Sequence, residues 1–311
     1  MKNTYYKGYW MVTNRCNLRC SYCVLENAPH QLRAELSLEE KKELVSHLYH
    51  KLHFRRLTLS GGEVLIFGKH PPKEFLELLN HIKTFKSLDH TKNLGIEIYT
   101  NGTYLTDEIA DKMVGVVDRV AVTIDGTSND FLSEIGRNHK NHTNYFDHIV
   151  AVAQRLSSRG IDVKLHSVVG QKNHLFLPEE VPLILDAIEK SGGSISAWKF
   201  FQYMSYDAPE KDTLHHIEKE AYEVFKEKVL EKIPGSFKGL HFKDNAEMNA
   251  SLFNILSYGN AQYMRDGDSW NTSKRTRDLR EYASMEDLFN QHDINQTRFR
   301  QFHEISHGVR S

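Results

Sequence analysis

The feature that most constrains the fold of this chain is a regular alternation of short apolar segments with longer amphipathic ones. The apolar segments read as β-strands, and they cover residues 9–13, 55–63, 95–105, 119–126, 162–170 and 196–203. The segments between them have apolar residues at helical spacing, and they cover residues 37–52, 73–85, 107–116, 145–160 and 177–193. Strands separated by helices form right-handed βαβ units with a parallel sheet. The pattern therefore predicts an α/β fold, a partial (β/α)6 barrel.

The six units end near residue 204, which divides the chain into two expected parts. Residues 1–204 are predicted to form the partial-barrel core, and residues 205–311 a C-terminal extension that closes the barrel over the active site. A hydrophobic fraction of 40% is enough for a sizeable core. Lys and Arg number 40 against 41 Asp and Glu, so no overall field attracts nucleic acid or an anionic membrane. We expect a monomeric cytoplasmic protein, since the start lacks a signal-peptide pattern.

All three cysteines of the chain lie within eight positions, at Cys16, Cys20 and Cys23. Three thiolates on one short loop can bind three irons of a [4Fe–4S] cluster, which leaves the fourth iron open to a small molecule. A structural zinc site is an alternative, but it needs a distant His as its fourth ligand. Three structural thiols are a further alternative that gives no reason for the clustering. With no other cysteine in these 311 residues, a second cluster is not expected.

Polar or glycine-rich groups follow four successive predicted strands. The cysteines follow the first strand, Gly61-Gly62-Glu63 the second, Asn101-Gly102 the third and Asp125-Gly126 the fourth. In parallel α/β folds the chemistry is found where strands end and loops begin. Asn-Gly and Asp-Gly are also ordinary turn dipeptides, so each pair alone is weak support. Together the four positions predict one site at the carboxyl ends of the strands.

These motifs, in this order, resemble the radical S-adenosylmethionine (SAM) superfamily. The residues that carry the resemblance are CNLRCSYC, LTLSGGE, YTNG and VTIDG, and it covers about residues 8–204. It implies that the three cysteines hold a [4Fe–4S] cluster and that the open iron binds SAM. The positions implied to contact SAM lie at strand ends or beside the cysteines: Tyr22, Gly61, Gly62, Glu63, Asn101, Thr123, Asp125 and Ser167. The superfamily usually has Pro after GGE, whereas this chain has Val64.

The resemblance also implies the reaction type. One electron reaches the cluster from an external donor such as flavodoxin or ferredoxin, and SAM is cleaved to a 5′-deoxyadenosyl radical. That radical takes a hydrogen atom from the substrate. The cofactors carry the difficult chemistry, while the protein positions them and excludes water.

The second half of the chain is most similar to viperin and its microbial relatives. The closest stretch is Trp198–Gln202, and residues 134–142, 162–173 and 247–267 also match. This resemblance implies a lyase for antiviral defence that dehydrates a ribonucleoside triphosphate to a 3′-deoxy-3′,4′-didehydro product. This chain differs from viperins at three positions, where it has Tyr9, Met11 and His166. Because those positions would touch substrate, another nucleotide or another small polar molecule stays open as the substrate.

Cationic and polar side chains near the later strand ends are the candidates for substrate binding: Arg137, Lys140, Lys164, His166, Lys199 and Gln202. Inward-pointing cations would neutralise a triphosphate, and the uncharged groups would bind a base or sugar. Solvated surface lysines are the plain alternative for Lys140 and Lys164. Two other functions remain open: radical modification of a ribosomal peptide or small metabolite, and a zinc-stabilised protein without catalytic activity.

Overall fold

The computed structural model describes residues 4–27, 33–68, 72–87, 94–138, 144–206, 209–233, 235, 237–265, 267–268 and 270–305. The chain forms two compact units. Unit 1 contains residues 1–15, 33–98 and 249–311, and unit 2 contains residues 16–32 and 99–248. The expected division into a partial-barrel core over 1–204 and a C-terminal extension over 205–311 stays a prediction.

Unit 1 is built on strands in the order β10-β9-β8-β1-β2-β3. Their bounds are β1 (Tyr6–Thr13), β2 (Phe54–Gly61), β3 (Gly95–Thr100), β8 (Phe253–Ile255), β9 (Asn260–Tyr263) and β10 (Lys274–Asp278). β1 pairs in parallel with β2 and with β8, β2 pairs in parallel with β3, and β9 and β10 continue antiparallel. The unit boundary falls inside β3, between residues 98 and 99.

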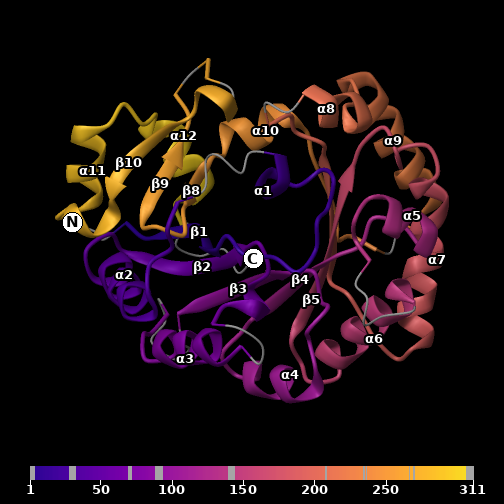
Figure 1. The fold of residues 1–311 in the computed structure, drawn as a ribbon, viewed down its shortest axis with the longest axis horizontal. Coiled ribbons are helices and arrows are strands. Elements are labelled where there is room, and N and C mark those ends of the chain that lie inside the picture. Colours follow the sequence, from indigo (N-terminus) through magenta and orange to yellow (C-terminus); the bar gives the residue numbers. More distant parts are fainter. Residues whose placement is uncertain are drawn as a thin grey trace. The chain divides into compact units, whose positions relative to one another are not determined.

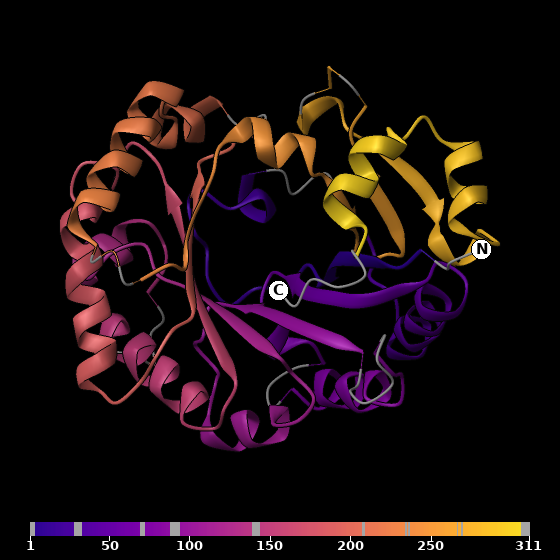
Figure 2. The ribbon, with the colours of Figure 1, turned by 180° about the vertical axis from the view of Figure 1, so that it is seen from behind.

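The helices of unit 1 bury apolar side chains, and two of them, α2 and α12, pack on strands. They are α2 (Leu38–His50), α3 (Lys73–Ile82), α11 (Met285–Gln291) and α12 (Gln296–His303). α2 begins with the expected capping box, in which the Ser37 side chain accepts from the Glu40 N–H and the Glu40 side chain accepts from the Ser37 N–H. α2 and α3 lie side by side, with α2 against β2 (Figure 2). The ring of Phe299 in α12 packs on Phe253 of β8, 4.9 Å between centroids.

Unit 2 is built on four parallel strands in the order β4-β5-β6-β7. Their bounds are β4 (Arg119–Thr123), β5 (Asp162–Val169), β6 (Ala197–Gln202) and β7 (Leu240–Lys243). Trp198 and Phe200 of β6 are fully buried, and Phe200 packs on Phe225 of α9. This apolar face of β6 therefore faces the helices, and the opposite face carries the polar residues described below.

Eight helices lie wholly or mainly within the described part of unit 2. They are α1 (Val24–Asn27), α4 (Asp107–Met113), α5 (Asn129–Glu134), α6 (Tyr145–Ser157), α7 (Leu177–Lys190), α8 (Pro209–His215), α9 (Lys219–Lys232) and α10 (Asn245–Ala250), the last crossing the unit boundary. α6, α7 and α9 follow one another along one side of the strands (Figure 1). Buried residues of α6 recur at helical spacing, namely Tyr145, Ile149, Val152, Ala153 and Leu156.

The six strands and five helices expected from the sequence are all present, with ends shifted by a few residues. The structure adds β7, β8, β9 and β10, which the sequence pattern did not indicate. Three of these extend the sheet of unit 1 beyond β1. Closure of the barrel by residues 205–311 stays a prediction. In the described ranges, no helix has the length and apolar character to cross a membrane, and a cytoplasmic location also stays a prediction.

Candidate active site

The loop that carries the cysteines is fixed within unit 2 by backbone hydrogen bonds. The N–H of Arg19 donates to the carbonyl of Gly136 at 3.3 Å, and the N–H of Ser21 donates to the carbonyl of Ile135 at 3.0 Å. Gly136 has φ +74°, and a Cβ there would lie 2.1 Å from the Arg19 carbonyl oxygen. Only glycine permits this close approach. The segment before α6 therefore sets the path of the loop around Cys20.

Nitrogen donors face the sulfur atoms of Cys16 and Cys20. The Leu18 N–H lies 3.4 Å from Cys16 Sγ, and Asn101 Nδ2 lies 3.9 Å from the same sulfur. Arg137 Nη1 lies 3.6 Å from Cys20 Sγ. Cys16 is exposed, whereas Cys20 is buried. N–H groups aimed at sulfur stabilise thiolates, the form in which cysteine binds metal.

Cys23 is similarly placed for a metal-bound thiolate. Burial raises the pKa of its thiol to about 12, and nearby Cys20 adds to the effect. The backbone N–H groups of Leu25 and Glu26 act in the opposite direction by hydrogen bonding to the sulfur. A proton on this sulfur is exchanged for iron when a cluster binds, and the two N–H donors then stabilise the thiolate.

An unsatisfied donor in the same loop fits a cluster as well. Asn17 lies between the first two cysteines, and its Oδ1 accepts from Asn101 Nδ2 at 2.9 Å. Its Nδ2 atom is buried without a hydrogen-bond partner. A buried donor without an acceptor costs about 1–3 kcal/mol, which a sulfide or a ligand oxygen would offset. The N–H donors around this loop therefore fit a [4Fe–4S] cluster bound by the three cysteines.

A single metal ion fits less well. Within the described residues, no three His, Cys, Asp or Glu side chains gather as the ligands of one ion would. A cubane does not require such gathering, because each thiolate binds a different iron. The zinc alternative has no geometric support in the residues described.

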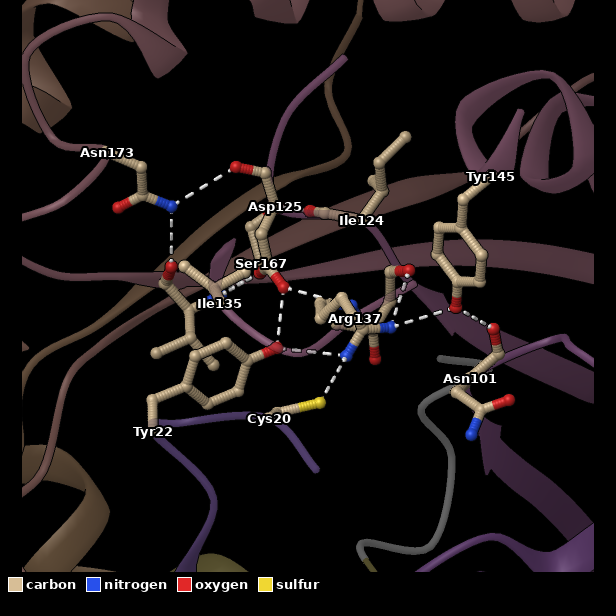
Figure 3. Close-up of polar contacts among 12 residues, drawn as sticks. Cys20, Tyr22, Asn101, Ile124, Asp125, Ile135, Arg137, Tyr145, Ser167 and Asn173 are labelled. Carbon is tan, nitrogen blue, oxygen red and sulfur yellow. Dashed lines mark hydrogen bonds and ion pairs between the residues drawn. The ribbon is translucent and has the colours of Figure 1, made fainter. Parts of the chain in front are cut away.

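Beside Cys20 lies a buried polar network centred on Arg137 (Figure 3). Arg137 Nη1 donates to the Tyr22 hydroxyl at 2.9 Å, and Nε lies 3.2 Å from Asp125 Oδ2. Nη2 donates to the Thr123 carbonyl at 3.1 Å and to the Tyr145 hydroxyl at 3.3 Å. The Tyr22 hydroxyl donates to Asp125 Oδ2 at 2.5 Å. Arg137 and Asp125 are 4% and 0% exposed, so this ion pair is shielded from solvent.

Asp125 is held from a second side by β5. Its Oδ1 accepts from the Val168 N–H at 2.8 Å, and its carbonyl accepts from Asn173 Nδ2 at 3.2 Å. Burial raises the pKa of the Asp125 carboxyl, and the Arg137 guanidinium partly offsets this. The Ser167 hydroxyl donates to the Ile124 carbonyl, as Figure 3 shows. The contacts of Asp125 and Ser167 with SAM stay predictions.

The Gly-Gly-Glu segment is anchored to the end of β1 within unit 1. The Gly62 N–H donates to the Thr13 carbonyl, and the Glu63 N–H to the Arg15 carbonyl, both at 2.8 Å. Gly61 has φ +151°, and a Cβ there would lie 2.2 Å from the Thr13 carbonyl oxygen. Glu63 is fully buried, and its Oε1 accepts from the Leu65 N–H at 3.0 Å. The close approach explains the glycine at 61, and the contacts of all three residues with SAM stay predictions.

Sequence reasoning missed a carboxylate that holds the same strand end. Glu35 Oε1 accepts from the Thr13 hydroxyl at 2.9 Å and from the Asn14 N–H at 2.6 Å. Its Oε2 lies 3.8 Å from the ammonium of Lys41, which is fully buried in α2. The Lys41 ammonium also donates to the Leu36 carbonyl. This pair therefore fixes the residues that lead into the cysteine loop.

A row of cationic and imidazole groups crosses unit 2 on the face opposite Trp198. Register places Thr123 beside His166, His166 beside Lys199, and Lys199 beside His241. Lys164 precedes His166 by two residues and so shares its face. Lys164 and Lys199 are each third in their strands, so the expected position at the strand ends is wrong for both.

His166 is enclosed in this row. It is 6% exposed, and its ring meets the rings of Tyr99 and Phe201 edge-on, with centroids 4.4 Å and 5.1 Å apart. Burial lowers the pKa of His166 well below its ordinary value, and Lys164 and Lys199 lower it further. His166 is therefore a neutral imidazole among cations.

A cavity of about 590 Å³ opens beside β7. Its lining includes Lys164, Lys199 and Lys243 on the strands and Lys226 on α9, together with the imidazole of His241. Burial lowers the pKa of Lys243, Glu247 acts against this, and Lys164 lowers it further. The lining also includes the carboxylates of Glu223, Asp244 and Glu247. The cavity is within the usual size range of ligand pockets. His241 and Lys243 were not expected from the sequence, since β7 is short and lies beyond residue 204.

Two further predicted substrate residues have other surroundings. Gln202 Nε2 donates to the Ile217 carbonyl at 3.0 Å, and its Oε1 accepts from the Asn245 N–H at 3.1 Å. Gln202 is therefore engaged in holding the segments before α9 and at the start of α10. Lys140 lies outside the described residues. Substrate contact stays a prediction for both.

Comparison with known families agrees with this arrangement. The model of the radical SAM superfamily matches residues 10–175, more than half of the 311-residue chain. The chain belongs to the radical SAM superfamily. Members of this superfamily use a [4Fe–4S] cluster and SAM, so these two cofactors are assigned to this chain as well.

Among curated radical SAM relatives, the GTP 3′,8-cyclase of Ectopseudomonas mendocina is 28% identical over 159 residues, 51% of this chain and 44% of that protein. The Fe-coproporphyrin III synthase of Methanosarcina barkeri is 26% identical over 184 residues, 58% of this chain and 40% of that protein. The chain thus spans less than half the length of these two relatives.

Solved structures share the fold at low identity. Streptococcus suis SuiB bound to its precursor peptide SuiA has a TM-score of 0.66 at 12% identity, covering 94% of this chain and 66% of that one. The enzyme anSMEcpe with bound AdoMet has a TM-score of 0.61 at 14% identity, covering 95% and 82%. The predicted fold class, an α/β fold of the radical SAM partial-barrel type, is confirmed.

Proposed function

We propose that this radical SAM enzyme dehydrates the ribose of a ribonucleoside triphosphate, the reaction that its resemblance to viperin implies. The observation that carries the proposal is the lysine-lined cavity of unit 2. Lys164 and Lys199 line it from adjacent strands, and the neutral imidazole of His166 lies beside Lys199 in the sheet. A triphosphate is the common metabolite group that matches several clustered cations.

A curated relative supports a nucleotide in general terms. The name GTP 3′,8-cyclase states a nucleotide substrate for a protein that is 28% identical to this chain over half its length. The reaction of that relative is not carried over, because less than half of it is matched. The resemblance of Trp198–Gln202 to viperin is what favours dehydration. The same resemblance to viperin is the basis for proposing a role in antiviral defence.

When bound, the cluster and SAM supply the 5′-deoxyadenosyl radical. The residues of this chain have three tasks in the proposed reaction: to bind the phosphates, to present the ribose and to exclude water. The hydrogen atom from C4′ goes to 5′-deoxyadenosine. The substrate radical then takes up one proton and one electron, and the 3′-hydroxyl leaves as water as the C3′–C4′ double bond forms. The external donor therefore provides two electrons per turnover, one for SAM cleavage and one for this step.

The direct test is an anaerobic incubation of the reconstituted protein with SAM, dithionite and, separately, CTP, UTP, GTP and ATP. The proposal predicts that one nucleotide becomes lighter by one water, in step with 5′-deoxyadenosine. Slow 5′-deoxyadenosine formation with all four nucleotides unchanged would contradict it. That result would favour a ribosomal peptide or another small metabolite as the substrate.

A further inference from the structure

We propose that Arg137 and Asp125 set the reduction potential of the cluster by acting through Cys20. Arg137 is then a positioning residue of the cluster rather than a substrate contact. The inference rests on the cluster assignment and not on the nature of the substrate. It begins from the network that Figure 3 shows around the Arg137 guanidinium.

Four of the five N–H groups of the Arg137 guanidinium donate to protein atoms. Nη1 faces Cys20 and Tyr22, and Nη2 faces Thr123 and Tyr145, at distances between 2.9 and 3.6 Å. Nε forms an ion pair with Asp125 Oδ2 at 3.2 Å, although its N–H makes no hydrogen bond. A phosphate would have to displace several of these contacts in a side chain that is 4% exposed. The geometry therefore argues against the substrate role expected from the sequence.

The network reaches a second cysteine. The Tyr145 hydroxyl, which accepts from Arg137, donates to the Asn101 carbonyl. The Asn101 side chain in turn lies 3.9 Å from Cys16 Sγ. Contacts thus run from Cys20 through Arg137 and Tyr145 to Asn101 (Figure 3), and from Asn101 to Cys16. A side chain so placed fixes both the position and the electrostatic surroundings of the cluster.

Hydrogen bonds to cluster sulfurs and nearby positive charge favour the reduced, more negative cluster, and so raise its reduction potential. The Arg137 charge is permanent, and at this depth salt does not screen it. The Asp125 carboxylate opposes it from 3.2 Å. The pair is neutral as a whole, but only the arginine contacts the sulfur. Removing one member therefore leaves the other uncompensated, and the two removals act in opposite directions.

The experiment is a potentiometric titration of the reconstituted cluster, followed by electron paramagnetic resonance without substrate. Arg137→Gln is expected to lower the potential and Asp125→Asn to raise it, with the double variant between the two. Arg137→Lys retains the positive charge but lacks the paired N–H groups of the guanidinium. Its reduction potential is expected to lie between those of the wild type and Arg137→Gln. The control is Arg119→Gln, which breaks an Arg–Asp pair with Asp162 that is about one-third exposed and has no cysteine contact.

Opposite shifts in the two single variants, with the Arg119→Gln potential unchanged, would support the proposal. Shifts of the same sign, or potentials equal to wild type, would overturn it. If Arg137→Gln assembles no cluster, Arg137→Lys and Asp125→Asn still decide the matter. The titration contains no nucleotide, so a failure of the proposed function leaves its result valid.

Discussion

The ammonium of Lys41 lies 3.8 Å from Glu35 Oε2, and that carboxylate also accepts a hydrogen bond from the Asn14 N–H at 2.6 Å. A fully buried lysine is rare unless a carboxylate compensates its charge. Burial lowers the pKa of Lys41, and Glu35 acts against this. The pair thereby connects the core of α2 to the backbone that leads into the cysteine loop.

Glu35→Gln is expected to lower the free energy of unfolding by about 1–3 kcal/mol, because it leaves the Lys41 ammonium buried without its counter-charge. Anaerobic urea denaturation measures this. Lys42→Met is the control, since Lys42 pairs with Glu39 and Glu77, both largely exposed, and such surface pairs contribute about 0–1 kcal/mol. Equal losses in the two variants would show that the buried pair has no special role.

Gly136→Ala is expected to reduce the iron content of the reconstituted protein. The added Cβ would lie 2.1 Å from the Arg19 carbonyl oxygen, so the cysteine loop must shift. Gly115→Ala is a matched control, since Gly115 has a similar φ of +72° but no atom within 4 Å of an added Cβ. Positive φ costs alanine about 1–2 kcal/mol at either site. Iron per protein, measured after reconstitution, should fall only for Gly136→Ala.

Lys199→Met is expected to weaken triphosphate binding about 10–100-fold, because a charge-assisted hydrogen bond contributes about 1.5–3 kcal/mol. SAM cleavage by the reduced cluster should continue. Calorimetry with each nucleotide measures the binding. Lys190→Met is the control, an exposed lysine of α7 paired with Asp186. Unchanged nucleotide affinity in Lys199→Met would show that Lys199 does not bind the triphosphate.

Stability is expected to fall as the pH is lowered from about 6.5 to about 4, with a contribution from His215. Burial lowers the pKa of His215 to about 4, and Lys172 and Lys211 lower it further. Between about pH 6.5 and pH 4, His215 is protonated in the unfolded chain but neutral in the folded chain. Lowering the pH across this range therefore favours unfolding. His215→Gln should show a shallower fall in urea denaturation across this range. A slope equal to that of the wild type in His215→Gln would contradict this expectation.

The sequence predicted those parts of the fold that depend on local signals. The capping box at Ser37 and Glu40 marked the start of α2 correctly, and the polar groups after the first four strands marked the strand ends. Long-range pairing determined the rest. β8 has three residues and joins β1 through partners such as Asn254 beside Tyr9, more than 240 positions apart. No periodic pattern of three residues can indicate such a strand.

The same limit applies to the site. Spacing identified the three cysteines, since they lie within eight positions of one another. The five partners of Arg137 come from three separate segments, and the sequence alone could not distinguish a buried network from a phosphate contact. Lys41 belongs to a helix rich in charge, so its complete burial follows only from the packing of Phe67 and Leu36 around it.

The measurement that tests the central claim most directly is deuterium transfer from the ribose. The reconstituted enzyme would be incubated anaerobically with SAM, reductant and each of the four ribonucleoside triphosphates carrying deuterium at C4′. The account predicts that one of them transfers a single deuterium to 5′-deoxyadenosine while its 3′-hydroxyl is lost. Unlabelled 5′-deoxyadenosine with all four nucleotides would contradict the account.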